Sequence, residues 1–356
     1  MHILIKLIFA CLICLISVGM LYIAIVIGYS SLTAFQPDLV EKLPVDNHGK
    51  RMIIAGEEIL LMTWNIGYAG LGKEMDFFYE GGKQVRPSSE MNTKYLKGII
   101  SQFRSNAAVD LLLIQEVDFY SKRSYHINQH SMIAEVLSEY SSTFAVNYKA
   151  MFVPVPLNNP MGRVHSGLSI FSDFNLPEAD RISAPGRHTW PKRLFMLNRC
   201  FLKASYPIDT GKELVVYNIH NSAFSDEAAL RAAELSQLRS LAMEAYEKGH
   251  YVIVGGDWNQ NPPGMDTEKI RNYIPKKIWP IEHDYFPEGW TWAFDPVIPT
   301  NRDVDQPFDP GKTACTIIDY FLVSPNIKVI AVNTTDLQFE HSDHHPVTLR
   351  IILRAE

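Results

Sequence analysis

The sequence predicts an α/β domain of mixed strands that follows one apolar, membrane-spanning helix. Near the amino terminus, Leu7 to Tyr29 contain no charged side chain. Farther along, apolar runs with strand character alternate with stretches whose apolar residues recur at helical spacing. The order strand, helix, strand over residues 213–257 indicates a crossover unit, whereas most of the surrounding pattern is typical of antiparallel pairing. The 356 residues suffice for one large domain or two ordinary ones.

The apolar stretch is long enough to cross a membrane. Its 23 uncharged residues would form a helix of about 34 Å, against a hydrocarbon core of roughly 30 Å. A cleaved signal peptide is the alternative, although no small-x-small site closes the stretch before Ser30. Lys6 is the one charged side chain before it, which favours a cytoplasmic amino terminus and a soluble part outside the cytoplasm. We expect residues 1–30 to be a transmembrane anchor and 31–57, rich in turn residues, to be a linker.

Composition limits the partners of the soluble part. The chain has Lys+Arg 33 against Asp+Glu 39, a net charge of -6 and an isoelectric point near 6.1. Nucleic-acid binders are usually basic because phosphate neutralisation supplies much of their affinity. A nucleic-acid substrate is therefore less favoured. Binding a nucleic acid would require a local basic groove on the surface. Of the four cysteines, Cys200 and Cys315 lie outside the apolar stretch, and we expect both to be buried free thiols.

The first half of the soluble part contains four expected strands and two expected helices. Ser88 or Ser89 can cap the first helix, in which apolar residues recur from Tyr95 to Phe103. The segment Tyr68 to Pro87 is rich in glycine and aromatic residues and too long for a plain connection. The expected strands are Ile59–Gly67, Val109–Asp118, Phe144–Val155 and Gly162–Ser172, and the second helix is His130–Tyr140.

The second half of the soluble part contains five expected strands and one expected helix, and no internal repeat appears. We expect Leu194–Ala204 and Glu213–Asn218 to pair around a turn at Pro207–Gly211, and Asp226 to open a helix that stops at Gly249. The segment Trp279–Gly311 is irregular and is expected to line a cleft. The remaining expected strands are 252–257, Thr316–Val323 and Val347–Leu353.

The ends of these strands carry the polar side chains. The apolar run Val252–Val254 ends in two glycines and is followed by Asp257 and Asn259, which can point the same way because they are two residues apart. The same stretch is also typical of an Asp/Asn turn before Pro262. Corresponding positions elsewhere carry Asn65, Glu116, Asn218 with His220, Asp319, and Asp343 with His344.

This set of side chains suits phosphoester chemistry. Carboxylates and amides prefer Mg²⁺ or Mn²⁺ to zinc, and histidines serve phosphate binding and proton transfer. Asp319 lies inside an expected strand, where an unpaired acid is costly, and His344 is its candidate partner. Arg163 and His165 could contact a phosphate, although half-exposed strand residues would show the same pattern.

These motifs resemble the endonuclease/exonuclease/phosphatase superfamily, on the side of deoxyribonuclease I and the neutral sphingomyelinases. The matching stretches occur in the family's order and span most of the soluble part: Trp64-Asn65, Gln115-Glu116, Ser166-Gly167-Leu168, Asn218-Ile219-His220, Gly256-Asp257-Trp258-Asn259, Ile318-Asp319-Tyr320 and Ser342-Asp343-His344. The apurinic endonucleases lack a histidine at the position of His220. The resemblance implies a two-sheet β-sandwich flanked by helices, with the catalytic domain over residues 58–356.

The resemblance also implies roles for individual residues. Glu116 would be the main metal ligand, with Asn65 and Asp343 beside it. Asp257 and Asn259 would position the water or the phosphate. His344 would be the general acid/base, oriented by Asp319. His220 would contact the phosphate or donate a proton. Asn218 would bind the substrate.

The leading hypothesis is a membrane-tethered, Mg²⁺-dependent hydrolase of a lipid headgroup or another small phosphoester. An extracytoplasmic nuclease is the alternative within the same chemistry, because the superfamily shares these motifs among many substrates. A catalytically silent binding module is the alternative of another class, although every motif position is filled. The sequence leaves open the substrate, the number of metals and the oligomeric state.

Overall fold

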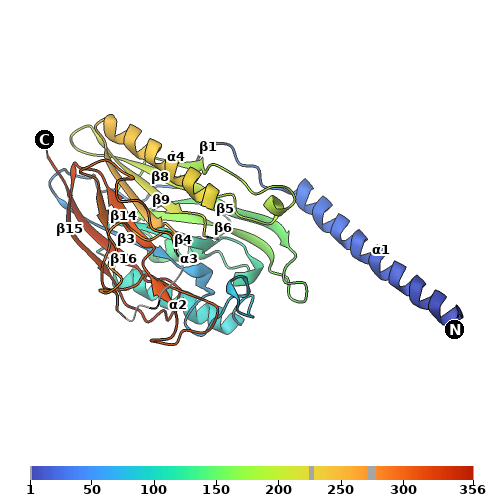
Figure 1. Ribbon diagram of the computed structural model, residues 1–356. Helices are drawn as coiled ribbons and strands as arrows, with labels where there is room; N and C mark the ends of the chain where they lie inside the picture. Colours follow the sequence, from blue (N-terminus) through green and yellow to red (C-terminus); the bar gives the residue numbers. More distant parts are fainter. Residues whose placement is uncertain (1, 107, 224–227, 272–273, 275–277, 356) are drawn as a thin grey trace.

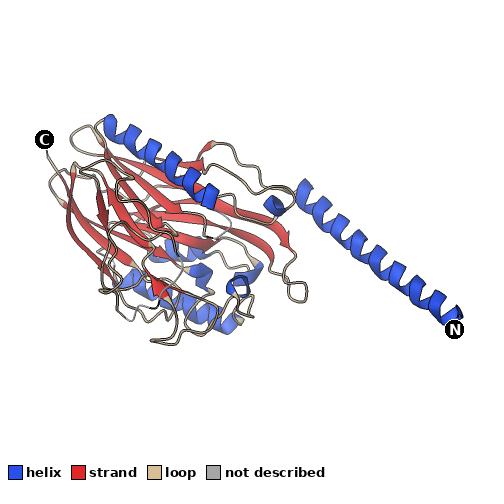
Figure 2. Cartoon of the chain, in the orientation of Figure 1, coloured by secondary structure: helices blue, strands red, loops and turns tan. Residues whose placement is uncertain are grey.

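A computed structural model describes residues 2–355, apart from 107, 224–227, 272–273 and 275–277. The described chain forms a sandwich of two seven-stranded mixed sheets with helices on its outer faces, and a long helix, α1, extends away from one end (Figures 1 and 2). This is the architecture that the motif resemblance implied.

The first sheet has the order β1-β7-β8-β9-β10-β14-β11. Its strands are β1 (Val40–Lys42), β7 (Glu178–Ser183), β8 (Cys200–Pro207), β9 (Glu213–His220), β10 (Tyr251–Asp257), β14 (Asp319–Val323) and β11 (Thr291–Ala293). The second sheet has the order β15-β16-β3-β4-β6-β5-β2. Its strands are β15 (Ile327–Thr334), β16 (Val347–Leu353), β3 (Glu58–Asn65), β4 (Leu111–Asp118), β6 (Gly162–Ser172), β5 (Ser141–Val153) and β2 (Val45–Asp46). A small ribbon pairs β12 (Asn301–Arg302) with β13 (Cys315–Thr316).

The core follows from the two-residue period of the strands. Alternate residues such as Leu61, Leu113 and Ile253 face the space between the sheets and are fully buried there. The intervening residues face the helices. Met62 and Leu112 pack under α2 (Ser89–Ser105) and α3 (Gln129–Val136), and the outer face of the first sheet packs under α4 (Ala228–Glu247).

The helix starts agree with the capping signals in the part of the chain that is described. Ser88 caps α2 by accepting a hydrogen bond from the amide of Met91, at 3.2 Å. The expected start of α4 at Asp226 lies outside the described residues. The short 3₁₀ turns are η1 (Gly67–Ala69), η2 (Phe78–Glu80), η3 (Lys122–Ser124) and η4 (Lys192–Leu194).

Two parallel pairs, β3 with β4 and β9 with β10, bring four strand ends to one end of the sandwich. β14 runs antiparallel to β10, so its first residue, Asp319, pairs with the last residue of β10, Asp257. The structure thus differs from the expected continuous strand Thr316–Val323. The amides of Ile318 and Asp319 both donate to the hydroxyl of Thr300, which interrupts the strand before Asp319.

The segment expected to be a linker is packed against the sandwich. Within residues 31–57, β1 pairs with β7 at the edge of one sheet and β2 pairs with β5 at the edge of the other. Arg51 and Ile53 form further isolated bridges. Short edge strands with prolines between them leave little periodicity to detect, which explains the expectation of a linker. The division into anchor, linker and catalytic domain stays a prediction.

The helix α1 (His2–Leu32) leaves its apolar side chains exposed, except where its last turns meet the domain at Val26 and Ser30. It contacts β5 and η4 there. By length and composition it could cross a membrane.

Candidate active site

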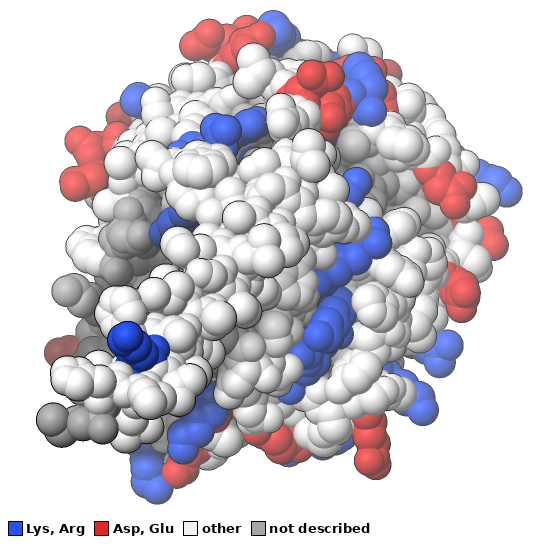
Figure 3. Space-filling view, turned by 90° about the vertical axis from the view of Figure 1, so that its right-hand side faces the viewer, with Lys and Arg blue, Asp and Glu red and all other residues white. Residues whose placement is uncertain are grey.

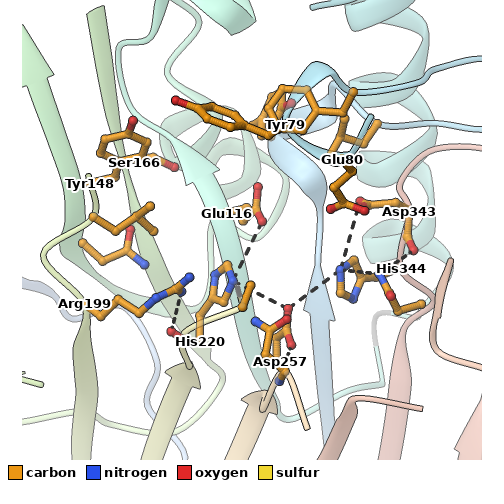
Figure 4. Close-up of a pocket in the computed structure, with 18 of the residues that line it drawn as sticks. Tyr79, Glu80, Glu116, Tyr148, Ser166, Arg199, His220, Asp257, Asp343 and His344 are labelled. Atoms are coloured by element: carbon orange, nitrogen blue, oxygen red, sulfur yellow. Dashed lines mark hydrogen bonds and ion pairs between the residues drawn. The ribbon is translucent and has the colours of Figure 1, made fainter. Parts of the chain in front are cut away.

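The four strand ends surround one cavity of about 140 Å³ (Figure 4). Glu116 comes from β4, His220 from β9 and Asp257 from β10, and Asp343 and His344 come from the loop before β16. The parallel neighbours meet here because their carboxyl ends share an edge of each sheet. Residues that are up to 228 positions apart in sequence therefore face each other.

A bulge in β4 directs Glu116 into the cavity. The register between β4 and β6 shifts between Ile114 and Val117, and Glu116 has a φ of 53°. A non-glycine residue in this left-handed region is strained, and such bulges often re-aim a side chain at a functional site. The Glu116 side chain keeps 24% exposure toward the cavity.

Asn65 links the carboxylates of the two sheets. Its side-chain nitrogen donates to Asp257 Oδ2 at 3.0 Å and to Glu116 Oε1 at 3.3 Å. Its side-chain oxygen accepts from the amide of Gly67 at 3.0 Å. Asn65 is 1% exposed, so these bonds are shielded from solvent and hold the two acids in place.

Asp319 and His344 form a buried dyad. His344 Nδ1 lies 2.8 Å from Asp319 Oδ2, and the two side chains are 5% and 0% exposed. The side-chain nitrogen of Asn301 lies 3.0 Å from His344 Nε2. In the neutral form of His344 whose Nδ1 donates to Asp319, Nε2 carries the lone pair that faces Asn301 and the cavity.

His220 lies on the opposite side of Asp257 from His344 (Figure 4). Its Nε2 is 3.6 Å from Asp257 Oδ2 and 3.9 Å from Glu116 Oε1. His344 Nε2 is 3.8 Å from the same oxygen of Asp257. Two imidazoles therefore flank one carboxylate, which allows proton transfer on both sides of a bound group.

Burial and charge shift the pKa values of these groups. Burial raises the pKa of Asp257 to about 7, and the neighbouring charge of Asp319 adds to this effect. Burial also raises the pKa of Glu116, with the charge of Arg123 opposing it. For His344, burial lowers the pKa, but the charges of Asp319 and Asp343 outweigh burial and raise it to about 10.

The backbone around Asp257 is constrained by packing. A Cβ on Gly256, whose φ is +145°, would lie 2.1 Å from the carbonyl oxygen of Ile219, so only glycine fits between β9 and β10. Trp258 stacks on Tyr320 with ring centroids 5.1 Å apart. Asn259 then adopts a φ of 52°, and its side chain donates to the carbonyl of Asn221 at 2.8 Å. Asp257 and Asn259 both line the cavity as a result.

Three predicted substrate-binding residues lie elsewhere. Asn218 is buried beneath the cavity, where it bonds Ile114, Gln115 and Ser169 across the sheets. Arg163 stacks over Tyr120, and His165 packs against Phe119. Neither Arg163 nor His165 lines the cavity. Side chains alternate along β6, and it is Ser166 that faces the cavity, so the residues at odd positions face away.

The structure adds residues that sequence reasoning missed. Arg199 lines the cavity and donates to the carbonyl of His220 at 2.8 Å. In the described part of the chain, no carboxylate lies within ion-pair distance of its guanidinium. Asn301, from the unassigned segment 279–311, reaches His344. Arg123 stacks over Tyr68 at 3.6 Å and bonds Asp118. No local pattern marks these residues, because each acts through a contact distant in sequence.

The donor set fits a divalent cation. Glu116 and Asp343 supply hard carboxylate oxygens on one side of the cavity. Asn65, the third predicted ligand, instead turns its side-chain nitrogen toward Glu116 and its oxygen toward the amide of Gly67. The raised pKa of Glu116 has burial as its main cause and the charge of Asp343 as a further one. A cation between these groups would relieve that repulsion. Asp257, Asp319 and His344 also bring ligand atoms within 4.8 Å of one another. Asp319 and His344 are already joined by a hydrogen bond of 2.8 Å, so we favour the first set.

Comparison with known proteins decides the family. The model of the Endonuclease/Exonuclease/phosphatase family matches residues 62–344. The chain belongs to this family. Its members are hydrolases that act on phosphoester bonds and generally use a divalent metal. A search of curated proteins found no match.

Solved structures agree with this fold at low sequence identity. An endonuclease/exonuclease/phosphatase from Beutenbergia cavernae has 16% identity and a TM-score of 0.56, over 84% of this chain and 72% of that one. ANGEL2, described as a 2',3'-cyclic phosphatase, has 14% identity and a TM-score of 0.54, over 88% and 99%. TDP2 from Caenorhabditis elegans has 16% identity and a TM-score of 0.52, over 84% and 75%.

Proposed function

We propose that this protein is a membrane-tethered, Mg²⁺- or Mn²⁺-dependent hydrolase of a lipid headgroup or another small phosphoester. The observation that carries the proposal is the arrangement around one cavity. The dyad of Asp319 and His344 lies on one side of Asp257, and His220 and Glu116 lie on the other. Phosphoester hydrolysis needs such a combination of cation ligands and proton-transfer groups.

The residues divide the reaction between them. Glu116 and Asp343 would hold the cation, which supplies charge neutralisation at the phosphoryl oxygens. Asn65, a predicted ligand, would hold the Glu116 carboxylate in place beside them. Asp257 and Asn259 orient the attacking water, whose oxygen bonds to phosphorus as the bond to the leaving oxygen breaks. His344, held by Asp319, accepts at Nε2 the proton that the attacking water loses. His220 lies across the cavity, where it contacts the phosphate or donates the proton that the leaving oxygen takes up.

The position of the cavity favours a lipid substrate. Tyr148, Met161 and Leu197 form an apolar wall of the cavity. The adjacent residues Lys149 and Asn198 line a groove at the end of α1. The cavity and the anchor therefore share one end of the sandwich, which would place a headgroup of the same bilayer within reach. Lys6 favours a cytoplasmic amino terminus and a catalytic domain outside the cytoplasm.

A nuclease activity is the second candidate. Arg199 lines the cavity and could neutralise a phosphate of any diester. The net charge of -6 weakens this candidate, because extended nucleic acids are held mainly by phosphate neutralisation. ANGEL2, which has a similar fold, is described as a 2',3'-cyclic phosphatase, so the fold accommodates a small phosphodiester as well.

A substrate panel tests the proposal. The full chain in nanodiscs is incubated with Mg²⁺ and, separately, with sphingomyelin, phosphoinositides, p-nitrophenyl phosphates, plasmid, single-stranded DNA and RNA, and the products are measured. Cleavage of a lipid or a small ester ahead of the nucleic acids is the expected result. Faster cleavage of DNA or RNA would favour the nuclease. No product from any phosphoester would favour a catalytically silent binding module.

A further inference from the structure

A groove lies where α1 meets the domain. Residues 31 and 34–36, at the end of the helix, line one side of it. The other side is formed by Lys149 of β5 and by Arg187, Trp190, Arg193 and Leu194. Its volume is about 190 Å³, and we call it the headgroup groove.

The surroundings of the headgroup groove are basic. Segments 148–165 and 184–199 contain no Asp or Glu, and they hold six basic residues: Lys149, Arg163, Arg187, Lys192, Arg193 and Arg199. Arg187 and Arg193 are exposed, and no described carboxylate lies within ion-pair distance of either. Figure 3 looks onto this end of the molecule, where Lys and Arg side chains run across the middle of the face and Asp and Glu lie toward its edge. This face therefore attracts anions despite the acidic net charge.

The same end also exposes apolar side chains. Trp190 is 56% exposed beside the groove, and Leu157 and Val155, in the turn between β5 and β6, are 76% and 37% exposed. Tryptophan is enriched at the boundary between headgroups and hydrocarbon, where its ring can be apolar on one side and wet on the other. Basic and apolar side chains together at the end of an apolar helix are typical of a surface that rests on a bilayer.

We propose that the headgroup groove binds the phosphate of an anionic phospholipid in the bilayer that α1 crosses. Arg187 and Arg193 contact the phosphate, and Trp190 lies at the level of the headgroups. The proposal rests on the tether of the proposed function and not on its hydrolase activity. The groove is distinct from the catalytic cavity, and its occupant is held, not cleaved.

The position of α1 favours a membrane lipid over a soluble phosphate as the ligand of the headgroup groove. Ser31 in the last turn of α1 and residues 34–36 just after the helix form one wall of the groove, so a helix in the bilayer brings the groove to the height of the headgroups. The guanidinium fork matches phosphate oxygens in pairs. Because segment 184–199 continues into the cavity wall at Met196, Leu197 and Arg199, a bound lipid would also hold the cavity against the membrane surface.

Tryptophan quenching in nanodiscs tests the site without any catalytic step. The α1 helix contains no tryptophan, so quenching by lipid brominated near the headgroup reports on the domain. The full chain is placed in nanodiscs of neutral phosphatidylcholine with increasing brominated phosphatidylglycerol. We expect quenching to rise with the anionic lipid and to be largely lost in Trp190→Phe. The double variant Arg187→Gln/Arg193→Gln should need about a tenfold or greater mole fraction for half-maximal quenching, since each basic residue adds roughly a fivefold preference.

A matched double variant controls for the loss of two positive charges. Lys328→Gln/Arg354→Gln changes two exposed residues at the opposite end of the sandwich, where β15 begins and β16 ends, and should quench as the unmodified chain does. Unchanged quenching in Trp190→Phe, or an unchanged lipid preference in the arginine double variant, would overturn the site. A chain that fails to enter nanodiscs would contradict both the tether and the site, whereas one that enters them without quenching would contradict the site alone.

Discussion

Replacing Asp319 by asparagine separates the catalytic role of the dyad from a structural one. The substitution keeps the size of a side chain that is 0% exposed but removes its charge. Asp319 Oδ2 lies 2.8 Å from His344 Nδ1, and the nitrogen of an asparagine amide at that place would donate a hydrogen bond to Nδ1. The proton of neutral His344 would then be on Nε2, and the lone pair that faces the cavity would be lost.

The expected rate loss is large and the expected stability loss is small. Loss of an orienting carboxylate with the wrong histidine tautomer lowers kcat by about 10⁴-fold in a comparable triad. Stability is expected to change little, because the charge of Asp319 adds to the burial that raises the pKa of Asp257 to about 7. Removing one of two adjacent buried acids relieves repulsion and offsets part of the lost hydrogen bond.

Steady-state kinetics, Mg²⁺ titration and thermal unfolding of the same preparation measure these effects. Asp319→Asn should bind Mg²⁺ and unfold nearly as the unmodified chain does, with kcat reduced by orders of magnitude. Asp284→Asn makes the same change at an exposed position and serves as the control for the preparation of a variant. A near-normal kcat for Asp319→Asn at saturating Mg²⁺ would refute the dyad, and a lowered melting temperature with little loss of rate would assign Asp319 a structural role.

Three other substitutions test separate parts of the site and the fold. Glu116→Gln should raise the Mg²⁺ concentration for half-maximal activity by about tenfold or more, because it removes the main charged ligand; an unchanged Mg²⁺ titration would contradict that role. Arg199→Met should lower kcat/KM by about 10- to 100-fold, since hydrogen bonds to charged groups contribute roughly 1.5–3 kcal/mol, whereas Arg239→Met, which is exposed, should not. His130→Gln tests stability. Burial lowers the pKa of His130 to about 4 in the folded chain, against a usual value near 6.5. As the pH falls below about 6.5 the unfolded chain takes up the proton before the folded chain does, so the free energy of unfolding decreases between these two values. Urea unfolding should therefore show that the stability difference between the unmodified chain and His130→Gln shrinks by about 2 kcal/mol from pH 7.5 to 5, and a constant difference would contradict the shift.

The strand ends could be predicted because their residues follow recognisable apolar runs. Asn65, Glu116, His220 and Asp257 each close a strand whose periodicity is visible in the sequence. Parallel neighbours must bring such ends together. The pairing of Asp319 with His344, 25 positions apart, was expected because a buried acid needs a partner, and the 2.8 Å contact confirms that the two side chains meet.

The wall of the cavity could not be predicted in the same way. Arg163 and His165 stand three positions and one position before Ser166, and an odd number of residues along a strand reverses the face to which a side chain points. Asn301 belongs to a segment without periodicity. Arg199 falls within the expected strand Leu194–Ala204, but the strand begins only at Cys200, and the contact of Arg199 with the end of β9 closes only in the folded chain. Pairing of residues 40–46 with the sheet edges was likewise hidden, because two or three residues of strand carry no detectable alternation.

Metal-dependent turnover tests the central claim most directly. The full chain is stripped with EDTA, returned to its best substrate from the panel, and assayed while Mg²⁺ is added back, with His344→Ala measured in parallel. We expect hydrolysis to disappear with EDTA and to return with Mg²⁺ in the unmodified chain, and to stay absent in His344→Ala. Hydrolysis that persists in EDTA, or that returns fully in His344→Ala, would contradict a metal-dependent mechanism built on this cavity.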